Sequence, residues 1–336
     1  MSDCAPVGVV IPAYNAATTI RRALLSVAAQ SLKPTQVIVV DDGSTDDTET
    51  VARACSSEMP GVELLVVRQD NAGAGAARNR GVAEVSQPYI AFLDADDEWL
   101  AEKLERSMDV LTKGDFDLVA HDFYAHQNGE DQHVHATRLF NATSDPLSSL
   151  YVRGYIPSIT VVVRKDLIDA VGGFDVTLPN AQDFDLWLAM LLQPNVRFTM
   201  FDEPLARYRQ GQSGIMSHTE RRLSCCLRIA RRYTPYFSTK THVMRILAVH
   251  KEAMLAHLAN RKRVRAVLIP VRLIVAMFAE LLASAFLGAG EQVRKPAIKV
   301  ARLNIVSVTW AAGVLSLYIA QFGNVMNPIL RILGLK

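Results

Sequence analysis

Three short acidic segments contain the residues best suited to chemistry in this chain. Residues 41–46 read Asp-Asp-Gly-Ser-Thr-Asp, residues 94–97 read Asp-Ala-Asp-Asp, and residues 183–185 read Asp-Phe-Asp. The first two directly follow apolar runs, residues 37–40 and 89–93, that are typical of buried parallel strands. Ligands of open α/β sheets bind outside the carboxyl ends of the strands, so carboxylates placed there can hold a divalent cation, a ribose or a base edge. The pattern favours a protein that handles a nucleoside diphosphate through a metal ion.

Strands and helices must alternate along the first 120 residues to place these acids. Apolar, β-branched runs predict strands at residues 7–11, 37–40, 62–67, 89–93 and 117–120, the first of them ending at Pro12. Helical spacing of apolar residues between them predicts a doubly wound, mostly parallel sheet of the α/β class. Residues 121–160 are rich in polar residues and predict a hairpin and loops, and helices are expected again at residues 164–171 and about 184–192.

Six motifs then occur in a fixed order. They are residues 9–15 (Val-Val-Ile-Pro-Ala-Tyr-Asn), 41–46, 71–79 (with Asn-Ala-Gly and Ala-Arg-Asn at its ends), 94–97, 171–175 (Val-Gly-Gly-Phe-Asp) and 182–187 (Gln-Asp-Phe-Asp-Leu-Trp). Together they resemble the inverting family-2 glycosyltransferases with the GT-A fold. The resemblance extends to about residue 213 and so covers roughly two thirds of the chain.

The resemblance implies roles for the acidic residues. Asp96 would be the direct ligand of Mg²⁺ or Mn²⁺, and Asp94 would contact the ribose or a metal-bound water. Asp183 would be the base that deprotonates the attacking hydroxyl. The family usually has Glu-Asp at that point, and Gln182 here replaces the first acid, which leaves the role of Gln182 open. The alternative is structural: Asp94 or Asp97 caps a helix that begins near residue 100, and Asp183 caps the helix expected at about residues 184–192.

The nucleotide base is expected to lie between the first two strand ends. By the resemblance Asp42 accepts a hydrogen bond from the base, which favours uridine, and Asp41 shares in this. Pro12, Ala13 and Tyr14 would surround the base with backbone and a ring edge, although plain packing is an equal alternative for Tyr14.

The diphosphate is expected to meet basic residues and glycine backbone. Arg78 can reach the phosphates, since a guanidinium matches their geometry, and the alternative is an arginine on a helix surface. Gly73 would let the backbone approach the nucleotide closely. Residues 208–213 resemble the family's mobile loop over the donor, but Gln210 stands where many relatives have His. Arg207 or Arg209 is then left as a phosphate contact.

Histidines gather in the polar segment after residue 120. His121 and His126 precede His133 and His135, and the alternate spacing of the last two puts both rings on one face of a strand. No third ligand is visible at a matching spacing, so the sequence favours a polar hairpin beside the acceptor cleft over a structural metal.

The charge of the chain is divided unevenly. Residues 1–217 contain 17 Lys and Arg against 30 Asp and Glu, whereas residues 218–336 contain 19 against 4. A basic segment predicts nucleic acid or an anionic membrane surface as partner. Residues 303–330 contain no charged residue, which excludes nucleic acid in favour of the membrane.

The basic half predicts a helical membrane-association region. Four of the five residues 261–265 are basic. In the helix expected after them, Arg272 and Glu280 lie on one side, which resembles an interfacial helix. The alternative is a core helix. Residues 303–322 are long enough to span a bilayer. If both segments crossed the bilayer, the basic loop at residues 291–302 would lie outside, against the tendency of basic loops to stay inside. We therefore expect one interfacial helix together with either one membrane span or a second surface helix.

These observations predict a glycosyltransferase domain at residues 1–217, with a nucleotide-sugar half to about residue 120 and an acceptor half beyond it, followed by the membrane-association region at 218–336. No secretory signal is recognised, and four cysteines without a pairing pattern fit a reducing compartment, which predicts the cytoplasmic face of a bacterial inner membrane. The expected reaction moves a hexose, with glucose preferred, from a UDP-sugar to a lipid-linked saccharide in surface polysaccharide synthesis. The alternatives are a polyprenyl-phosphate glycosyl synthase and a non-catalytic, membrane-bound glycan-binding or scaffold protein.

Overall fold

The structure is a computed structural model that describes residues 4–141, 144–209, 219–259 and 269. The chain divides into two compact units, Met1–Tyr233 and Thr234–Lys336. In the second unit the described elements are the short 3-10 helix η4 (Thr234–Tyr236) and helix α10 (Thr239–Ala259). The division near residue 217 that the charge pattern predicts stays a prediction.

A seven-stranded sheet forms the centre of the first unit. Its strands lie in the order β10 (Phe198–Phe201), β6 (Leu118–His121), β9 (Val162–Arg164), β4 (Tyr89–Phe92), β1 (Cys4–Ala13), β2 (Lys33–Asp41) and β3 (Glu63–Arg68). Neighbouring strands are parallel except β9, which runs antiparallel to both β4 and β6. The predicted α/β class is confirmed, and the sheet is mixed through this one strand, which the sequence analysis missed.

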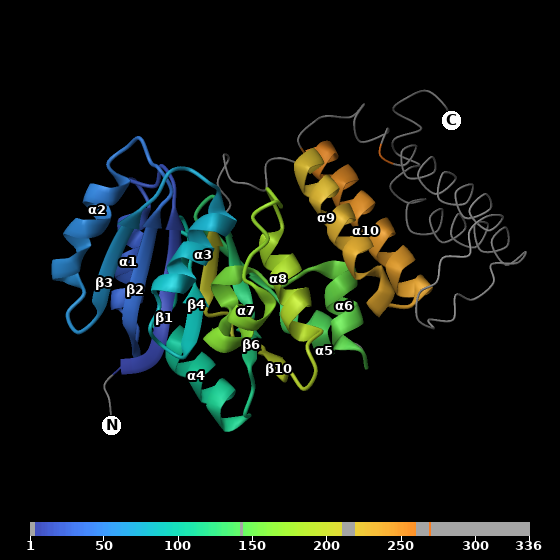
Figure 1. The fold of residues 1–336 in the computed structure, drawn as a ribbon, viewed down its shortest axis with the longest axis horizontal. Coiled ribbons are helices and arrows are strands. Elements are labelled where there is room, and N and C mark those ends of the chain that lie inside the picture. Colours follow the sequence, from blue (N-terminus) through green and yellow to red (C-terminus); the bar gives the residue numbers. More distant parts are fainter. Residues whose placement is uncertain (1–3, 142–143, 210–218, 260–268, 270–336) are drawn as a thin grey trace, which may run out of the picture. The chain divides into compact units, whose positions relative to one another are not determined.

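Helices cover both faces of this sheet. They are α1 (Ile20–Ala28), α2 (Thr48–Ala54) with the 3-10 helix η1 (Cys55–Glu58), α3 (Ala74–Glu84), α4 (Lys103–Lys113), α7 (Lys165–Val171) and α8 (Gln182–Leu191). Figure 1 shows α3 and α7 in front of the strands. Alternate residues of β1 serve the two faces: Val9 joins the core under α1 and α4, and Val10 points to α3. Gly81 lets α3 approach so closely that a Cβ there would lie 2.4 Å from the Val10 side chain.

A second, smaller sheet is formed by segments that include those directly after β4 and β6 in the sequence. Its order is β5 (Glu98–Trp99), β11 (Ala206–Arg209), β7 (Phe123–Gln127) and β8 (Glu130–Val134). The predicted hairpin after residue 120 is confirmed as β7 and β8. Strand β11 pairs with both β5 and β7 and thereby brings the segment after Asp94 next to residues 207–209.

Two expectations about local structure are wrong. Strand β1 does not end at Pro12 but continues to Ala13, where it pairs with Asp41. The proline is tolerated because β1 pairs with β4 only as far as Val10, so the missing N–H breaks no bond on that side. Residues 136–141 and 146–153 are not loops: they form helices α5 (Ala136–Asn141) and α6 (Pro146–Arg153), the second capped by Asp145.

Helix α9 (Thr219–Tyr233) completes the first unit and is held there by charge. Arg232 donates to both carboxylate oxygens of Asp185 at 2.8 and 2.7 Å and to Asp175 at 2.5 Å. Within the described residues, no helix is both long and apolar enough to cross a membrane. The predicted interfacial helix and the segment 303–322 lie outside those residues, apart from Ile269.

Candidate active site

The carboxyl ends of β1, β2, β4 and β6 meet at one edge of the main sheet, and the predicted site residues follow these ends. Loop residues tie the first two ends together. The backbone N–H of Asn15 donates to the Ser44 hydroxyl at 2.9 Å, and the Asn15 side chain accepts from the Thr45 N–H at 2.9 Å. The segments on either side of the expected nucleotide base are therefore held in register by hydrogen bonds.

Asp94 and Arg78 form a close ion pair at the end of β4. The Arg78 Nη2 atom lies 2.6 Å from the Asp94 Oδ1 atom, and the Arg78 residue is only 7% exposed. The arginine therefore does not lie on a helix surface, and that alternative is wrong. Its guanidinium stands 5.6 Å from the ring centroid of Phe174, and its Nε atom is buried with no hydrogen-bond partner. The guanidinium on α3 is thus buried beside Asp94 with one N–H group that has no hydrogen-bond partner among the described residues.

Asn79, next in α3, was missed as a positioning residue. Its Nδ2 donates to the Phe174 carbonyl at 2.9 Å, and its Oδ1 accepts from the Phe174 N–H at 2.8 Å. Gly173 has φ +76° and approaches so closely that a Cβ there would lie 2.5 Å from the Asn79 Oδ1 atom. The amide thereby fixes the ring that covers Arg78. The Ala-Arg-Asn and Gly-Gly-Phe motifs were the only sequence signals of this pairing.

Asp97 is buried at the start of the second sheet. It is 1% exposed, its Oδ1 accepts from the Arg209 N–H at 2.7 Å, and its Oδ2 is buried with no partner. Helix α4 begins at Lys103 with Glu102 as its N-cap, so neither Asp94 nor Asp97 caps it. The predicted capping of α4 by these residues is wrong.

Asp183 comes from the first turn of α8. The N-cap residue of α8 is Ala181, so Asp183 does not cap this helix. One carboxylate oxygen accepts from the Phe184 N–H at 2.8 Å, and the other lies 3.5 Å from the Ser158 hydroxyl. The residue is partly exposed, which leaves its carboxylate within reach of a ligand.

The four carboxylates act on shared neighbours. We call them the carboxylate cluster: Asp94, Asp96, Asp97 and Asp183. Burial by itself lowers the pKa of Arg78, but Asp94, Asp183 and Asp97 raise it on balance. Burial and the negative charges of all four members also raise the pKa of Tyr208 on β11. Asp183 on α8 and the acids after β4 therefore influence the same two side chains.

Negative charge in the carboxylate cluster is incompletely compensated. Burial, followed by the charges of Asp94 and Asp96, raises the pKa of Asp97 well above its ordinary value. Asp96 is exposed as a residue, yet the atoms packed around its carboxyl, and then Asp94, raise its pKa. Oxygen donors and an excess of negative charge fit a hard divalent cation. The donor set is therefore compatible with the Mg²⁺ or Mn²⁺ expected at Asp96.

The two acids after β2 are bound within the chain. Asp42 accepts from the N–H groups of Ala72 and Gly73 at 2.9 and 2.8 Å and from the Gln69 amide at 2.8 Å. Asp41 is fully buried and accepts from Arg68 at 2.6 Å. These bonds hold the start of α3 against β2. The contact of Asp41 and Asp42 with the nucleotide base stays a prediction.

The remaining predicted residues are distributed along the same edge. Tyr14 is 53% exposed and is not packed in the core, while Ala13 is buried and Pro12 is partly exposed. Arg209 pairs with Glu98, with its Nη2 atom 2.8 Å from Glu98 Oε2. Its contact with phosphate is likewise untested. Gln210 lies outside the described residues.

Gln182, which precedes Asp183, has a structural role. Its amide nitrogen donates to the Leu178 carbonyl at 2.5 Å, and a Cβ on Gly75 would lie 3.1 Å from that nitrogen. The side chain is buried between α8 and the start of α3. Asp185, the second acid of the third segment, is engaged by Arg232, so only Asp183 of that segment belongs to the carboxylate cluster.

Comparison with known proteins gives relatives that are described as glycosyltransferases. The family model described as glycosyl transferase family 2 matches residues 8–172. The amylovoran biosynthesis glycosyltransferase AmsB of Erwinia amylovora is 30% identical over 207 residues, which is 60% of this chain and 68% of AmsB. The chain spans only 32 to 60% of the length of five Rickettsia relatives described as uncharacterized glycosyltransferases.

Two solved structures share the fold at low identity. The S. aureus TarS 1-349 complex with UDP-GlcNAc has a TM-score of 0.58 and 21% identity, covering 75% of this chain and 72% of that one. Mannosyltransferase PcManGT from Pyrobaculum calidifontis, in complex with GDP-Man and Mn²⁺, has a TM-score of 0.57 and 20% identity, covering 96% and 87%. The mixed α/β architecture is therefore GT-A-like. Together with the matched family model and AmsB, this shows that the chain belongs to glycosyl transferase family 2.

Proposed function

We propose that this protein transfers a hexose from a UDP-sugar to a hydroxyl group of a lipid-linked saccharide during synthesis of a surface polysaccharide. The observation that carries the proposal is the carboxylate cluster around Arg78 and Tyr208 at the carboxyl edge of the sheet. It combines acids suited to a cation with a separate, partly exposed acid on α8. Those are the two chemical functions that displacement of a nucleoside diphosphate by a hydroxyl needs.

A divalent cation would be held by Asp96, with Asp94 beside it. When bound, Mg²⁺ or Mn²⁺ offsets the charge that develops on the departing diphosphate. Arg78 would add to this, because its positive charge lies beside Asp94, with Nη2 2.6 Å from the Asp94 Oδ1 atom. The Mn²⁺ in the PcManGT complex supports a cation for this fold.

Asp183 would remove the proton from the acceptor hydroxyl. Its place in the first turn of α8, with Ser158 at 3.5 Å, leaves a carboxylate oxygen for that role. A single base opposite the leaving group gives an in-line displacement, so the product would have the inverted anomeric configuration.

The choice of donor and acceptor rests on the relatives. TarS was crystallised with UDP-GlcNAc, which supports a UDP-sugar, and glucose stays our preferred hexose. AmsB is named for amylovoran biosynthesis, which supports a polysaccharide product. A basic, apolar C-terminal region would hold the enzyme at the cytoplasmic face of the membrane, where a lipid-linked acceptor is found.

A donor screen tests this proposal. Full-length protein is incubated with a panel of UDP- and GDP-sugars, and nucleoside diphosphate release is measured with and without extracted lipid-linked saccharides. We expect release of UDP that needs the saccharide, and none from an Asp94→Asn/Asp96→Asn control. Release with polyprenyl phosphate alone would favour the synthase alternative, and no release from any pair would reject transferase function.

A further inference from the structure

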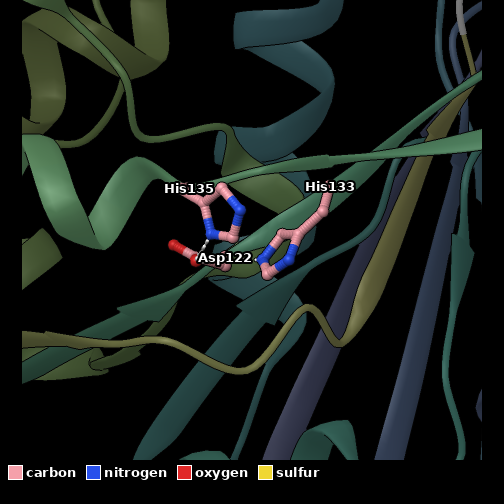
Figure 2. A group of neighbouring side chains, drawn as sticks. All are labelled: Asp122, His133 and His135. Carbon is pink, nitrogen blue, oxygen red and sulfur yellow. Dashed lines mark hydrogen bonds and ion pairs between the residues drawn. The ribbon is translucent and has the colours of Figure 1, made fainter.

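A second group of ionisable side chains lies where strand β6 ends, apart from the carboxylate cluster. Figure 2 shows the rings of His133 and His135 facing the carboxylate of Asp122. The Asp122 Oδ2 atom is 3.1 Å from His133 Nε2 and 3.5 Å from His135 Nδ1. One donor atom from each residue lies within 4.8 Å of the other two. Asp122 is the third ligand that the spacing of the two histidines did not disclose.

The carboxylate is held in place from behind. Asp122 is fully buried, and its Oδ1 accepts from the Thr137 N–H at 2.8 Å, which turns Oδ2 toward the rings. Such support of a ligand by an outer hydrogen bond is typical of metal sites. His133 belongs to β8, whose register pairs it with Tyr124, and His135 follows two residues later on the same side. The strand therefore positions His133, and His135 follows directly after its end, with the two ring centroids 3.7 Å apart.

The spacing of the donor atoms fits a small tetrahedral ion. Zinc bonds of about 2.0–2.1 Å at tetrahedral angles separate neighbouring ligand atoms by about 3.3–3.4 Å. The observed nitrogen-to-oxygen separations of 3.1 and 3.5 Å lie on either side of that value. Two imidazoles with one carboxylate favour zinc and similar transition ions over magnesium or calcium, which prefer oxygen ligands.

We propose that Asp122, His133 and His135 form a binding site for Zn²⁺, separate from the cation expected at Asp96. The side chains of His133 and His135 are 29% and 37% exposed, so the site opens to solvent on the histidine side. Three protein ligands leave a fourth position for water or a ligand oxygen. The proposal does not depend on transferase activity.

The ion would fasten the β7–β8 hairpin to the end of β6. Strand β7 also pairs with β11, which contains Tyr208, so a fixed hairpin helps to fix that residue. In the main sheet β6 and β4 are separated only by β9, which corresponds to about 10 Å at ordinary strand spacing. The zinc site thus lies at the acceptor side of the same sheet edge.

Metal binding to the full-length protein tests the site directly. The protein is prepared without a polyhistidine tag, stripped with chelator and titrated with Zn²⁺ by calorimetry in an Asp96→Ala background, which removes the other expected cation site. We expect one Zn²⁺ per chain, a rise in Tm on adding Zn²⁺, and visible d–d absorption bands with Co²⁺. In a His133→Ala/His135→Ala variant the affinity should fall more than about a hundredfold, and the bands should disappear.

His126→Ala is the matched control. His126 lies in the same hairpin, 2.5 Å from Asp131 and outside the three ligands, so this variant should bind Zn²⁺ as tightly as its parent. The exposed His135→Ala change alone, checked for folding by circular dichroism, should weaken binding at least about tenfold. Absence of stoichiometric Zn²⁺ in the parent, or unchanged affinity in the folded His135 and double variants, would overturn the site.

Discussion

Asn79→Ala should destabilise the first unit and loosen the cover of Arg78. The variant removes two hydrogen bonds to the Phe174 backbone, of 2.9 and 2.8 Å. Each hydrogen bond contributes about 1 kcal/mol, so the free energy of unfolding should fall by about 2 kcal/mol if water replaces the amide. It should fall by about 4 kcal/mol if the N–H and carbonyl groups of Phe174 stay buried without partners. For a unit of this size, 1 kcal/mol corresponds to about 2–4 °C, so the Tm should fall by roughly 4–16 °C.

Differential scanning calorimetry of the full-length protein measures this change. Arg80→Ala is the matched control, since Arg80 lies in the same helix and the side chains of its ion pair with Glu84 are 53% and 30% exposed. Exposed pairs of this kind contribute about 0.5 kcal/mol or less, so the control should melt within about 2 °C of the parent. Equal melting temperatures for Asn79→Ala and Arg80→Ala would show that the amide does not hold the segment before α8.

Three further predictions concern charge. Asp96→Ala should abolish turnover and the metal-dependent part of UDP affinity while the protein stays folded, because Asp96 is exposed beyond a strand end; full activity after verified metal removal would contradict this. The raised pKa of Asp97 means that folding favours its protonated form. The contribution of Asp97 to the free energy of unfolding is therefore greatest below its ordinary pKa of 3.8, and it is lost as pH rises through the raised pKa. Asp97→Asn keeps the acceptor for the Arg209 N–H and removes this charge, so its Tm at pH 7 should be about 2–4 °C higher, with the gap closing near pH 4; a constant gap across pH would contradict the charge argument. Deletion of residues 261–336 should release the protein from membranes in a flotation assay, whereas high salt should release the full chain only poorly; complete release by salt alone would exclude apolar anchoring.

The sequence predicted well the parts of the fold that short-range pattern determines. Residues 37–40 and 89–93 read as buried strands and form the ends of β2 and β4, because continuous apolar runs bounded by polar turns have few other solutions. The acids that follow them were placed at the correct sheet edge for the same reason. Residues 162–164 did not stand out, since three residues carry no measurable period, and only pairing with β4 and β6 makes them a strand.

Within the site, the sequence identified side chains but not their partners. Arg78 was predicted as a phosphate contact, which stays a prediction, and its burial against Phe174 depends on a residue 96 positions later in the chain. A helix cap was the alternative for Asp97 because the start of α4 was placed too early; the two residues between Leu100 and Lys103 are a turn. Asp122 was missed as a neighbour of His133 because it lies just before β7, and only the pairing of β7 with β8 brings the two residues together. Long-range contacts of this kind decide which charged groups share one site.

The single-turnover rate of Asp183→Asn tests the central claim most directly. Asn keeps the size of the side chain and removes the base, so UDP-sugar affinity should change little, while the chemical step should slow by about a hundredfold or more. Asp185→Asn is the control, because Asp185 binds Arg232 and should affect stability rather than the rate. The wild-type product should show the inverted anomeric configuration by NMR. Near-normal turnover in Asp183→Asn, or a retained configuration, would contradict the assignment of Asp183 as the base.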